Sequence, residues 1–498
     1  MGDVLAQGFA QAAAPSSLLA TAIGSVLGIV IGMIPGMTIS TGIIIVLPLT
    51  FVLDPSISIA LLLGLYVGGM LGGSFAAIML NIPGTPSAAA TALDGHPMVV
   101  RGEAGRALGI AVLASFCGGL FSALCLFLIA PRLADIALGF RAPDLFSLVL
   151  LGLTVICSFA AKSWIKGLLS AAIGLAIVSI GQDPVMGTAR FTFGSPDLLS
   201  GINFLTALIG LFAIPQLIGN LGQTGSGAIV SVAPATFGRV FPTLADVRRM
   251  RLPVGIGSIV GTFLGILPGA GGPIAAFLSY DYARKTTKNA PEAFGEGAVE
   301  GIAAPESANN AVTGGALVPM MTLGIPGDPV TAILVGALLV HGLAPGPLLF
   351  IERADFAYGV IFSFFWANIF NLIIALAGLR VLVKLIAMPR TILMPAIAIL
   401  CVVGAYSLRN SVFDIYVMFF FGLLGLGMRW LEMPVVPLLL ALVLGRQLEE
   451  HLRVALTGSQ GDISVFFTSP FSVLFLSLAA VSIVWSIVSS QRSAGGAR

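Results

Sequence analysis

Two apolar segments share one pattern: Gly24-Ser-Val-Leu-Gly28-Ile-Val-Ile-Gly32-Met-Ile-Pro35-Gly36 near the start of the chain, and Gly257-Ser-Ile-Val-Gly261-Thr-Phe-Leu-Gly265-Ile-Leu-Pro268-Gly269 in its second half. The Gly, Ser and Pro-Gly positions coincide without a gap. A Pro removes a helical hydrogen bond and clashes with the preceding turn, while the following Gly frees the backbone from steric limits. The pattern therefore predicts that a helix stops at each Pro-Gly.

A second pair of interruptions follows in the same order. Gly72-Gly73 leads to Asn81-Ile-Pro83-Gly84-Thr85-Pro86, and Gly314-Gly315 leads to Gly324-Ile-Pro326-Gly327-Asp328-Pro329. Two matched pairs in matched order indicate an internal duplication. Single Pro and Gly residues also kink ordinary membrane helices. Four interruptions at matched positions favour the other interpretation, in which broken helices form a transporter binding site.

The composition predicts an all-α, polytopic transmembrane protein. Of the 498 residues, 57% are hydrophobic and 9% are charged, whereas soluble domains carry about 25% charged residues. Apolar runs such as 57–80, 107–130, 358–382 and 471–488 reach the roughly 20 residues that a bilayer requires. The alternating pattern of a membrane barrel is absent, so helices remain, and we expect about ten to twelve membrane segments or partial crossings.

Several other classes of protein are excluded by the sequence. The net charge is +2 without a basic stripe, so no nucleic-acid partner is expected. The membrane segments contain no His-Glu-x-x-His or Gly-x-Ser-x-Gly motif, so we do not expect an enzyme, and no cofactor is predicted. Residues 1–17 lack a basic region and a cleavage site, so no removable signal peptide is expected.

The duplication divides the chain into six segments. They are an N-terminal tail (1–17), the first repeat (18–131), connecting membrane helices (132–238), the second repeat (239–355), C-terminal membrane helices (356–490) and a short tail (491–498).

The charges around the repeats predict opposite orientations in the membrane, because Lys and Arg mark cytoplasmic loops. The second repeat has Arg239, Arg248, Arg249 and Arg251 before its first break and Arg284, Lys285 and Lys288 after it, whereas residues 1–100 contain no Lys or Arg. Its apolar stretch, 252–283, is split into two arms that are each too short for a full crossing. We therefore expect inverted repeats, each with a re-entrant hairpin and a broken helix. The first hairpin opens outward, and the second opens to the cytoplasm.

These segments resemble one known family. The strings Gly-Met-Ile-Pro-Gly-Met-Thr, Asn-Ile-Pro-Gly-Thr-Pro, Gly-Ile-Leu-Pro-Gly-Ala-Gly-Gly, Pro-Glu-Ser-Ala-Asn-Asn-Ala and His-Gly-Leu-Ala-Pro-Gly-Pro are similar to the TctA family, the large membrane subunit of tripartite tricarboxylate transporters. The resemblance covers roughly residues 18–460 and includes Asp94-Gly-His-Pro-Met and Arg101-Gly-Glu-Ala-Gly-Arg106.

The resemblance implies a symporter of the bacterial inner membrane that takes up an organic carboxylate such as a tricarboxylate. It also implies a coupling cation, usually sodium with the proton as the alternative. The implied partners are a small membrane subunit resembling TctB and a periplasmic substrate-binding protein resembling TctC. From the residues alone, an ion or solute channel that uses the carbonyls of broken helices is the alternative.

The Pro-Gly segments carry no Lys or Arg, so the positive ends of interrupted helices are the predicted anion site. The pairs Thr85-Pro86 and Asp328-Pro329 have the pattern of an N-cap followed by Pro at the first helical position, so each break is expected to start a new helix. The Asp328 carboxylate is either a cap, a ligand of the coupling ion, or both.

The polar residues around the breaks are the candidate site. The predicted substrate-binding residues are Thr38, Asn81, Thr85, Ser87, Gly271, Gly272, Ser307, Asn309 and Asn310. The predicted coupling-ion residues are Pro35, Gly36, Thr41, Gly269, Asn310, Thr313 and Asp328. A polar clamp between helices is the alternative for the segment from Glu306 to Asn310. Glu296 and Glu300 lie in a Gly-rich stretch and are expected to be solvated.

Overall fold

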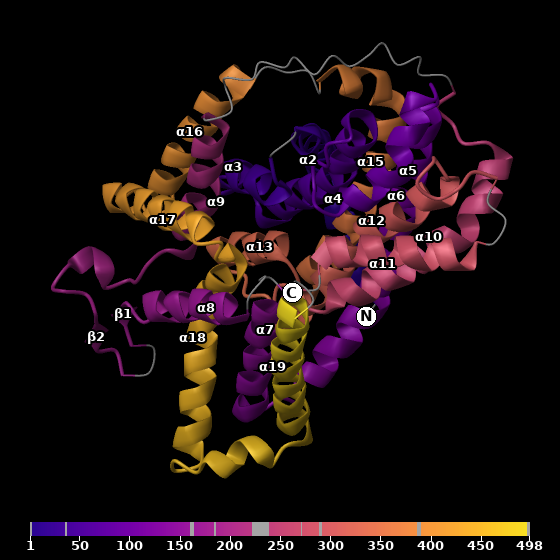
Figure 1. Cartoon of the computed structure of the whole chain (residues 1–498). Helices are drawn as coiled ribbons and strands as arrows, with labels where there is room; N and C mark the ends of the chain where they lie inside the picture. Colours follow the sequence, from indigo (N-terminus) through magenta and orange to yellow (C-terminus); the bar gives the residue numbers. More distant parts are fainter. Residues whose placement is uncertain are drawn as a thin grey trace. The chain divides into compact units, whose positions relative to one another are not determined.

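The computed structural model describes residues 2–34, 37–159, 164–183, 186–221, 239–269, 271–287, 291–385 and 390–495. This part of the chain contains nineteen α-helices and one short pair of strands (Figure 1). Five helices in it are long and apolar enough to cross a membrane: Pro15–Met33, Pro55–Leu80, Ala104–Ala137, Ala354–Leu379 and Val412–Trp430. The prediction of an all-α polytopic membrane protein is confirmed.

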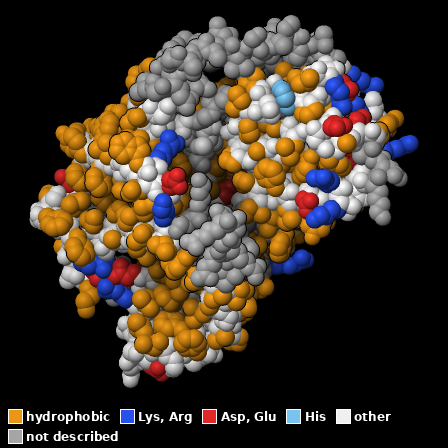
Figure 2. All heavy atoms as spheres, viewed as in Figure 1, with side chains coloured by type: hydrophobic (Ala, Val, Ile, Leu, Met, Phe, Trp, Pro, Cys, Tyr) orange, Lys and Arg blue, Asp and Glu red, His pale blue; other side chains and the backbone are white. Residues whose placement is uncertain are grey.

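Shorter apolar helices accompany these five. They are Ile39–Thr50, Ala142–Cys157, Trp164–Val178, Phe204–Gly219, Pro329–Val340, Ala398–Ser407 and Pro470–Val484. Hydrophobic side chains cover much of the face shown in Figure 2, and charged side chains gather there in small groups. A surface of this kind suits a lipid environment, because monomeric soluble proteins rarely expose large contiguous apolar patches.

The helices form two compact units, and both predicted repeats lie in the first, which comprises Met1–Ala134 and Gln216–Leu400. Its helices are α1 (Gly2–Ala12), α2 (Pro15–Met33), α3 (Ile39–Thr50), α4 (Pro55–Leu80), α5 (Ala88–Val100), α6 (Ala104–Ala137), α10 (Leu244–Ile266), α11 (Gly271–Thr286), α12 (Val299–Leu323), α13 (Pro329–Val340), α14 (Leu349–Glu352), α15 (Ala354–Leu385) and α16 (Arg390–Ser407), the last of which continues into the second unit.

The second unit comprises Asp135–Pro215 and Cys401–Arg498. Its elements are α7 (Ala142–Phe159), α8 (Trp164–Val178), β1 (Gly181–Gln182), β2 (Ala189–Arg190), the 3-10 helix η1 (Pro196–Leu198), α9 (Phe204–Leu221), α17 (Val412–Trp430), α18 (Val435–Gly458), the 3-10 helix η2 (Ile463–Phe467) and α19 (Pro470–Gly495). The antiparallel strands pair Gly181 with Arg190, and α18 packs on α7 and α8. Two hydrogen bonds from Arg190 to Glu449 connect β2 to α18.

Close backbone contacts hold the first two long helices of each repeat together. A Cβ on Gly28 of α2 would lie 2.3 Å from the carbonyl oxygen of Leu65 in α4, and a Cβ on Gly261 of α10 would lie 2.4 Å from that of Ala308 in α12. The glycines repeated every fourth residue therefore form close-packing helix surfaces, as small residues at this spacing do in membrane proteins.

These contacts also correct the alignment of the two repeats. A Cβ on Gly72 would lie 2.2 Å from the carbonyl oxygen of Ile29, and a Cβ on Gly315 would lie 2.4 Å from that of Thr262. Ile29 and Thr262 occupy the same place in the duplicated pattern, so Gly72 matches Gly315. The pairing of Gly72-Gly73 with Gly314-Gly315 is therefore wrong by one residue.

Two further segments differ from the expected layout. Helix α10 has 23 residues, longer than the short arm predicted, because a capping box between Thr243 and Asp246 starts it within the charged stretch that precedes the apolar one. Within the expected N-terminal tail, α1 is a helix that packs on α15. There Gln11 donates a hydrogen bond of 2.9 Å to Asp355.

Candidate functional site

The two breaks of the second repeat lie against each other, and in the first repeat the second break lies against the end of α2. A Cβ on Gly84 would lie 2.2 Å from the carbonyl oxygen of Gly32, and a Cβ on the matched Gly327 would lie 2.9 Å from that of Gly265. In the second repeat the Gly269 amide also donates to the Gly327 carbonyl at 2.9 Å. Pro35 and Gly36 of the first repeat lie outside the described residues. The second repeat therefore brings its two interruptions to one place, and the described part of the first repeat has the matching contact between Gly84 and the end of α2.

Both broken helices end in the same backbone conformation. Asn81 ends α4 with φ of 54°, and the matched Gly324 ends α12 with φ of 70°. This left-handed conformation satisfies the last turn of a helix and turns the chain sharply away. Side chains other than Gly and Asn rarely adopt it, so the presence of Asn in one repeat and Gly in the other is explained by the backbone.

The two repeats cross in opposite directions, and the helix that follows the second break of each repeat packs on the other repeat. Asn309 of α12 donates to the Met70 carbonyl of α4, and Ser74 of α4 donates to the Glu306 carboxylate of α12. Met70 pairs with Asn309, and Ser74, further along α4, pairs with Glu306, which is earlier in α12. Residue numbers therefore rise along α4 as they fall along α12, so the two helices run antiparallel. Helix α5 of the first repeat packs on α11 and α12 of the second, and α13 of the second packs on α3 and α4 of the first.

Five of the residues discussed above come together where α5 meets the second repeat. A Cβ on Gly272, at the start of α11, would lie 3.0 Å from Ser87 Cβ and 3.7 Å from Asn309 Oδ1. The hydroxyl groups of Thr85 and Ser87 are 3.2 Å apart, and Asn309 also faces the Glu306 carboxyl group. We call Thr85, Ser87, Gly272, Glu306 and Asn309 the Asn309 cluster. Four of the five are predicted substrate-binding residues.

The Asn309 cluster contains polar atoms without partners. Among the described residues, Glu306 Oε1 and Asn309 Oδ1 are buried and have no hydrogen-bond partner. Buried polar groups in proteins are nearly always hydrogen-bonded, so each exception requires an explanation. The start of α11 adds backbone amide groups at the positive end of a 16-residue helix. The cluster therefore offers both oxygen ligands and an anion site.

At the position that matches Asn309 in the other repeat, the polar side chains are hydrogen-bonded to one another. Tyr66 in α4 occupies the place that Asn309 occupies in α12, and its hydroxyl donates to the Asp328 carboxylate. The other oxygen of Asp328 accepts bonds of 2.7 Å from the Thr331 amide and 2.8 Å from the Thr331 hydroxyl. We call this the Tyr66–Asp328 pair. The prediction that Asp328 caps a helix with Pro329 at its first position is confirmed.

The matching prediction for Thr85 is wrong. Helix α5 begins at Ala88, with Ser87 as its N-cap and no side-chain capping bond. The chain instead forms turns in which the amide groups of Ala88 and Ala89 donate to the carbonyls of Thr85 and Pro86. The Thr85 side chain packs against Gly73 rather than capping α5, because a Cβ on Gly73 would lie 2.7 Å from it. The helix therefore starts at Ala88, two residues after the predicted first position, Pro86.

The other predicted residues lie apart from this cluster. Thr38 caps α3, and its hydroxyl lies 2.8 Å from that of Thr41. Ser307 and Thr313 donate to carbonyls of their own helix, Asn81 is exposed, and Gly271, with φ of 65°, precedes Gly272.

Asn310 lies in a separate polar contact between helices. Its amide nitrogen donates to the Ser115 carbonyl in α6 at 2.9 Å and to Asn368 Oδ1 in α15 at 3.0 Å. This is the arrangement of an interhelical polar clamp.

Sequence reasoning missed several residues of these contacts. Ser74, Thr91, Ser115 and Tyr66 come from apolar stretches of α4, α5 and α6 and carry no motif. Glu306 was noticed within its polar string but not assigned to the site. Its carboxyl group accepts from Ser74 and, at 3.1 Å, from Thr91. The one available signal was a carboxylate inside a helix whose other charged residue, Glu300, lies in the first turn; such a carboxylate is costly unless it has a role.

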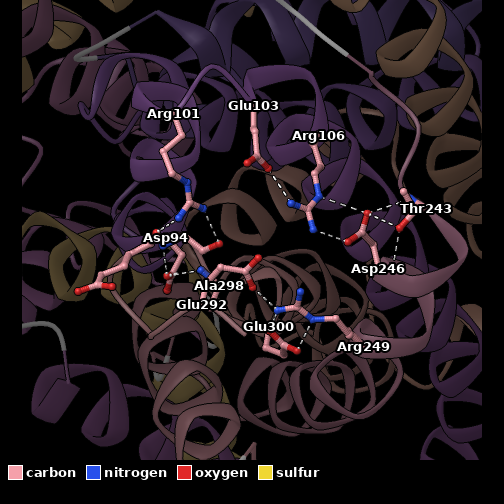
Figure 3. Close-up of polar contacts among 12 residues, drawn as sticks. Asp94, Arg101, Glu103, Arg106, Thr243, Asp246, Arg249, Glu292, Ala298 and Glu300 are labelled. Atoms are coloured by element: carbon pink, nitrogen blue, oxygen red, sulfur yellow. Dashed lines mark hydrogen bonds and ion pairs between the residues drawn. The ribbon is translucent and has the colours of Figure 1, made fainter. Parts of the chain in front are cut away.

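An ionic network joins α6 and α10 to the loop before α12 and to the first turn of α12 (Figure 3). Arg106 binds Asp246 at 2.6 Å, and Arg249 binds Glu292 at 2.7 Å and Glu300 at 2.8 Å. Glu300 is only 2% exposed, so the prediction that it is solvated is wrong, because the Arg249 guanidinium neutralises it. Glu296 is exposed, as predicted.

Asp94 fixes the same loop through its backbone. Its Oδ1 accepts hydrogen bonds from the amide groups of Gly295, Gly297 and Ala298 at 2.7–2.9 Å, and its Oδ2 accepts one from the Tyr280 hydroxyl at 2.9 Å. Gly295 and Gly297 have φ of 92° and 104°, which directs successive amides to one side, as in an anion-binding nest. The contact joins α5 of the first repeat to the second repeat.

The arrangement defines a multi-pass α-helical membrane protein. The family model described as the tripartite tricarboxylate transporter TctA family matches residues 18–440. The chain therefore belongs to the TctA family.

Two similar proteins come from Agrobacterium vitis. One is described as an uncharacterized 52.8 kDa protein in the TAR-I ttuC' 3' region and is 40% identical over 451 residues, which are 91% of this chain and 89% of that protein. The other, an uncharacterized protein in the TAR-II ttuC' 3' region, is 41% identical over 233 residues, which are 47% of this chain and 96% of that protein. No solved structure matches the chain.

Proposed function

We propose that this chain is the large membrane subunit of a tripartite system that imports an organic carboxylate, a tricarboxylate or a related acid, by symport. We expect sodium as the coupling cation, with the proton as the alternative. A small membrane subunit similar to TctB and a periplasmic binding protein similar to TctC complete the system in the bacterial inner membrane. Membership of the TctA family supports this assignment.

The observation that supports carboxylate binding most is the Asn309 cluster. Gly272 places the start of α11 beside Ser87, and a side chain at Gly272 would fill the space between them. Free amide groups and the helix dipole favour an anion at this end of a helix. A substrate carboxylate there would accept from the α11 amides and from the hydroxyl groups of Thr85 and Ser87.

Alternating access is supported by the relation between the repeats. Helices α4 and α12 run antiparallel, and the helix after the second break of each repeat, α5 or α13, packs on the other repeat. Inverted repeats let one site face either side of a membrane by a movement of one repeat against the other. In this proposal, the contacts of Asp94 and Arg249 with the loop before α12 close the cytoplasmic side and separate when the site opens inward.

The test is uptake of a panel of labelled carboxylates by cells that produce the chain with both partner subunits, with and without a sodium gradient. We expect saturable uptake that is lost when the gradient is collapsed. Flux that does not saturate, or that persists without any cation gradient, would instead identify a channel.

A matched pair of variants tests the carboxylate site itself. Gly272→Val puts a side chain against Ser87, so we expect carboxylate uptake to fall by about tenfold or more, because small displacements in a binding site have large effects. Ile39 occupies the matched place in the first repeat, and Ile39→Val should retain uptake once expression is taken into account. Equal uptake by both variants would remove Gly272 from the substrate site.

A further inference from the structure

Glu306 is a fully buried carboxyl group surrounded by neutral side chains. It is 0% exposed. Its Oε2 accepts from Ser74 of α4 and from Thr91 of α5, and Ser115 of α6 and Asn309 of its own helix also face it. Four helices from both repeats therefore converge on one carboxyl group.

The charge of Glu306 is not neutralised by the protein. In the described part of the chain, the groups that interact with this carboxyl are two serines, a threonine and an asparagine, and no ion pair reaches it. A buried carboxylate without a counter-charge is strongly unfavourable. Glu300 illustrates the usual solution, since Arg249 is its partner. Glu306 therefore requires a positive charge from outside the polypeptide.

The oxygens around Glu306 are suited to a hard cation. Glu306 Oε1, Asn309 Oδ1 and Ser115 Oγ are buried and have no hydrogen-bond partner among the described residues. All three are oxygen atoms, and they come from a carboxylate, an amide and a hydroxyl group, which are ligands that alkali cations accept. The described residues contain no group of three His, Cys, Asp or Glu side chains that could hold a metal ion, so a single carboxylate favours a monovalent ion.

We infer that Glu306, Asn309 and Ser115 bind the coupling ion as a Na⁺ site next to the carboxylate site. This inference rests on the proposed function and locates its ion. Asn309 belongs to both sites, because it faces Glu306 and also lies beside Gly272 and Ser87. The Pro-Gly breaks contain no Lys or Arg, so the bound cation supplies the positive potential that attracts the carboxylate. Ion binding and carboxylate binding therefore favour each other.

The test is a thermal unfolding titration of the purified full-length chain in detergent, without substrate or partners. NaCl replaces KCl at constant ionic strength and at a fixed pH near 8. A ligand that binds only the folded state raises the melting temperature with saturation. We expect a rise of about 2–4 °C at a Na⁺ concentration about tenfold above half-saturation.

Three variants locate the effect. Glu306→Gln keeps the size of the side chain and should abolish the Na⁺-dependent rise. Ser115→Ala removes a hydroxyl that faces Glu306 but has no hydrogen-bond partner among the described residues, so it should fold normally and require a Na⁺ concentration several-fold higher. Glu296→Gln changes an exposed glutamate nearby in the sequence and should behave as the parent chain. A full Na⁺-dependent rise in Glu306→Gln and Ser115→Ala would overturn the site.

A proton is the competing ligand and gives a different result. If the melting temperature of the parent chain ignores Na⁺ but changes with pH, and if Glu306→Gln removes that change, the sodium assignment is overturned. The measurement is independent of transport. If Na⁺ binds through Glu306 but the chain takes up no carboxylate, the proposed function is wrong and the site is not. If uptake depends on Na⁺ but Glu306→Gln still binds Na⁺ as the parent chain does, the site is wrong and the proposed function is not.

Discussion

The Asn309 cluster and the Tyr66–Asp328 pair occupy matched places in the two repeats but differ in their chemistry. At Tyr66, a hydroxyl group donates to a carboxylate whose other oxygen accepts two bonds from Thr331. At Asn309, the matched oxygen has no donor among the described residues, and Glu306 beside it has one oxygen in the same condition. The polar groups of the Tyr66–Asp328 pair bond to one another and to Thr331, whereas the Asn309 cluster has oxygen atoms without a donor among the described residues.

The difference shows how a duplicated backbone can serve two purposes. Both repeats keep the glycine contacts, the left-handed ends of α4 and α12 and the contact of the second break with the end of α2 or α10. These features depend on small residues and on backbone geometry, so they tolerate changes of the side chains nearby. The polar side chains at the two places have diverged, and the proposed ligand site depends on this difference.

We expect the largest effect from disrupting the close glycine contacts between helices, which both repeats share. Gly261→Val puts a side chain against the Ala308 carbonyl at 2.4 Å or less, and because a backbone cannot move aside easily, we expect a loss of about 3 kcal/mol or more in stability. Gly28→Val should do the same in the first repeat. The measurement is the yield of monodisperse protein in detergent.

Gly255→Val is the control for this effect, since a Cβ at Gly255 has nothing within 4 Å although the residue lies on the same helix. Normal yields from Gly28→Val and Gly261→Val would show that the helix pairs are not held by these contacts.

The second experiment compares the matched residues Asp328 and Thr85. Asp328→Ala removes a helix cap, at about 0.5–2 kcal/mol, and leaves the buried Tyr66 hydroxyl without its acceptor, at about 1–3 kcal/mol. Thr85→Val keeps the shape of the side chain and removes only a hydroxyl that caps nothing, so we expect a loss under about 1.5 kcal/mol. Melting temperatures in detergent measure both, and similar losses would mean that the two breaks are held in the same way.

Features that depend on residues close together in the sequence could be predicted from it, whereas contacts between residues far apart in the sequence could not. The breaks, the glycine surfaces and the Asp328 cap are local patterns, and each was predictable from Pro, Gly and capping preferences. The partners of Glu306 lie 232 and 215 residues away in the chain, and no local pattern specifies them. The Thr85 prediction failed because packing against Gly73, and not the local capping pattern, positions this residue.

The third experiment compares the loops that precede α12 and α4, and its expected effect is smaller. The loop before α12 is held by charges. Burial raises the pKa of the Glu292 carboxyl group, but the hydrogen bond and the charge of Arg249, together with a backbone hydrogen bond and the charge of Arg106, outweigh burial, and the pKa is lowered overall. The loop before α4 is held by neutral bonds such as that from Ser58 to the Thr50 carbonyl at 2.9 Å.

A lowered pKa in the folded state stabilises the protein above the unfolded value of 4.5, and this stabilisation is lost as the pH falls below it. We therefore expect a modest decrease in melting temperature between about pH 5 and pH 3. Glu292→Gln should show a smaller decrease, and Ser58→Ala should retain the decrease of the parent chain. An identical acid decrease in Glu292→Gln would exclude this carboxylate as a cause.

The contact between α5 and the second repeat has a consequence for biosynthesis. Asp94 emerges from the ribosome 201 residues before Gly295, the first of its backbone partners. When α5 is made, α4 is already present to cover one of its faces, but the face that packs on α11 and α12 has no partner until those helices are translated. The final contacts of the first repeat therefore depend on the synthesis of the second.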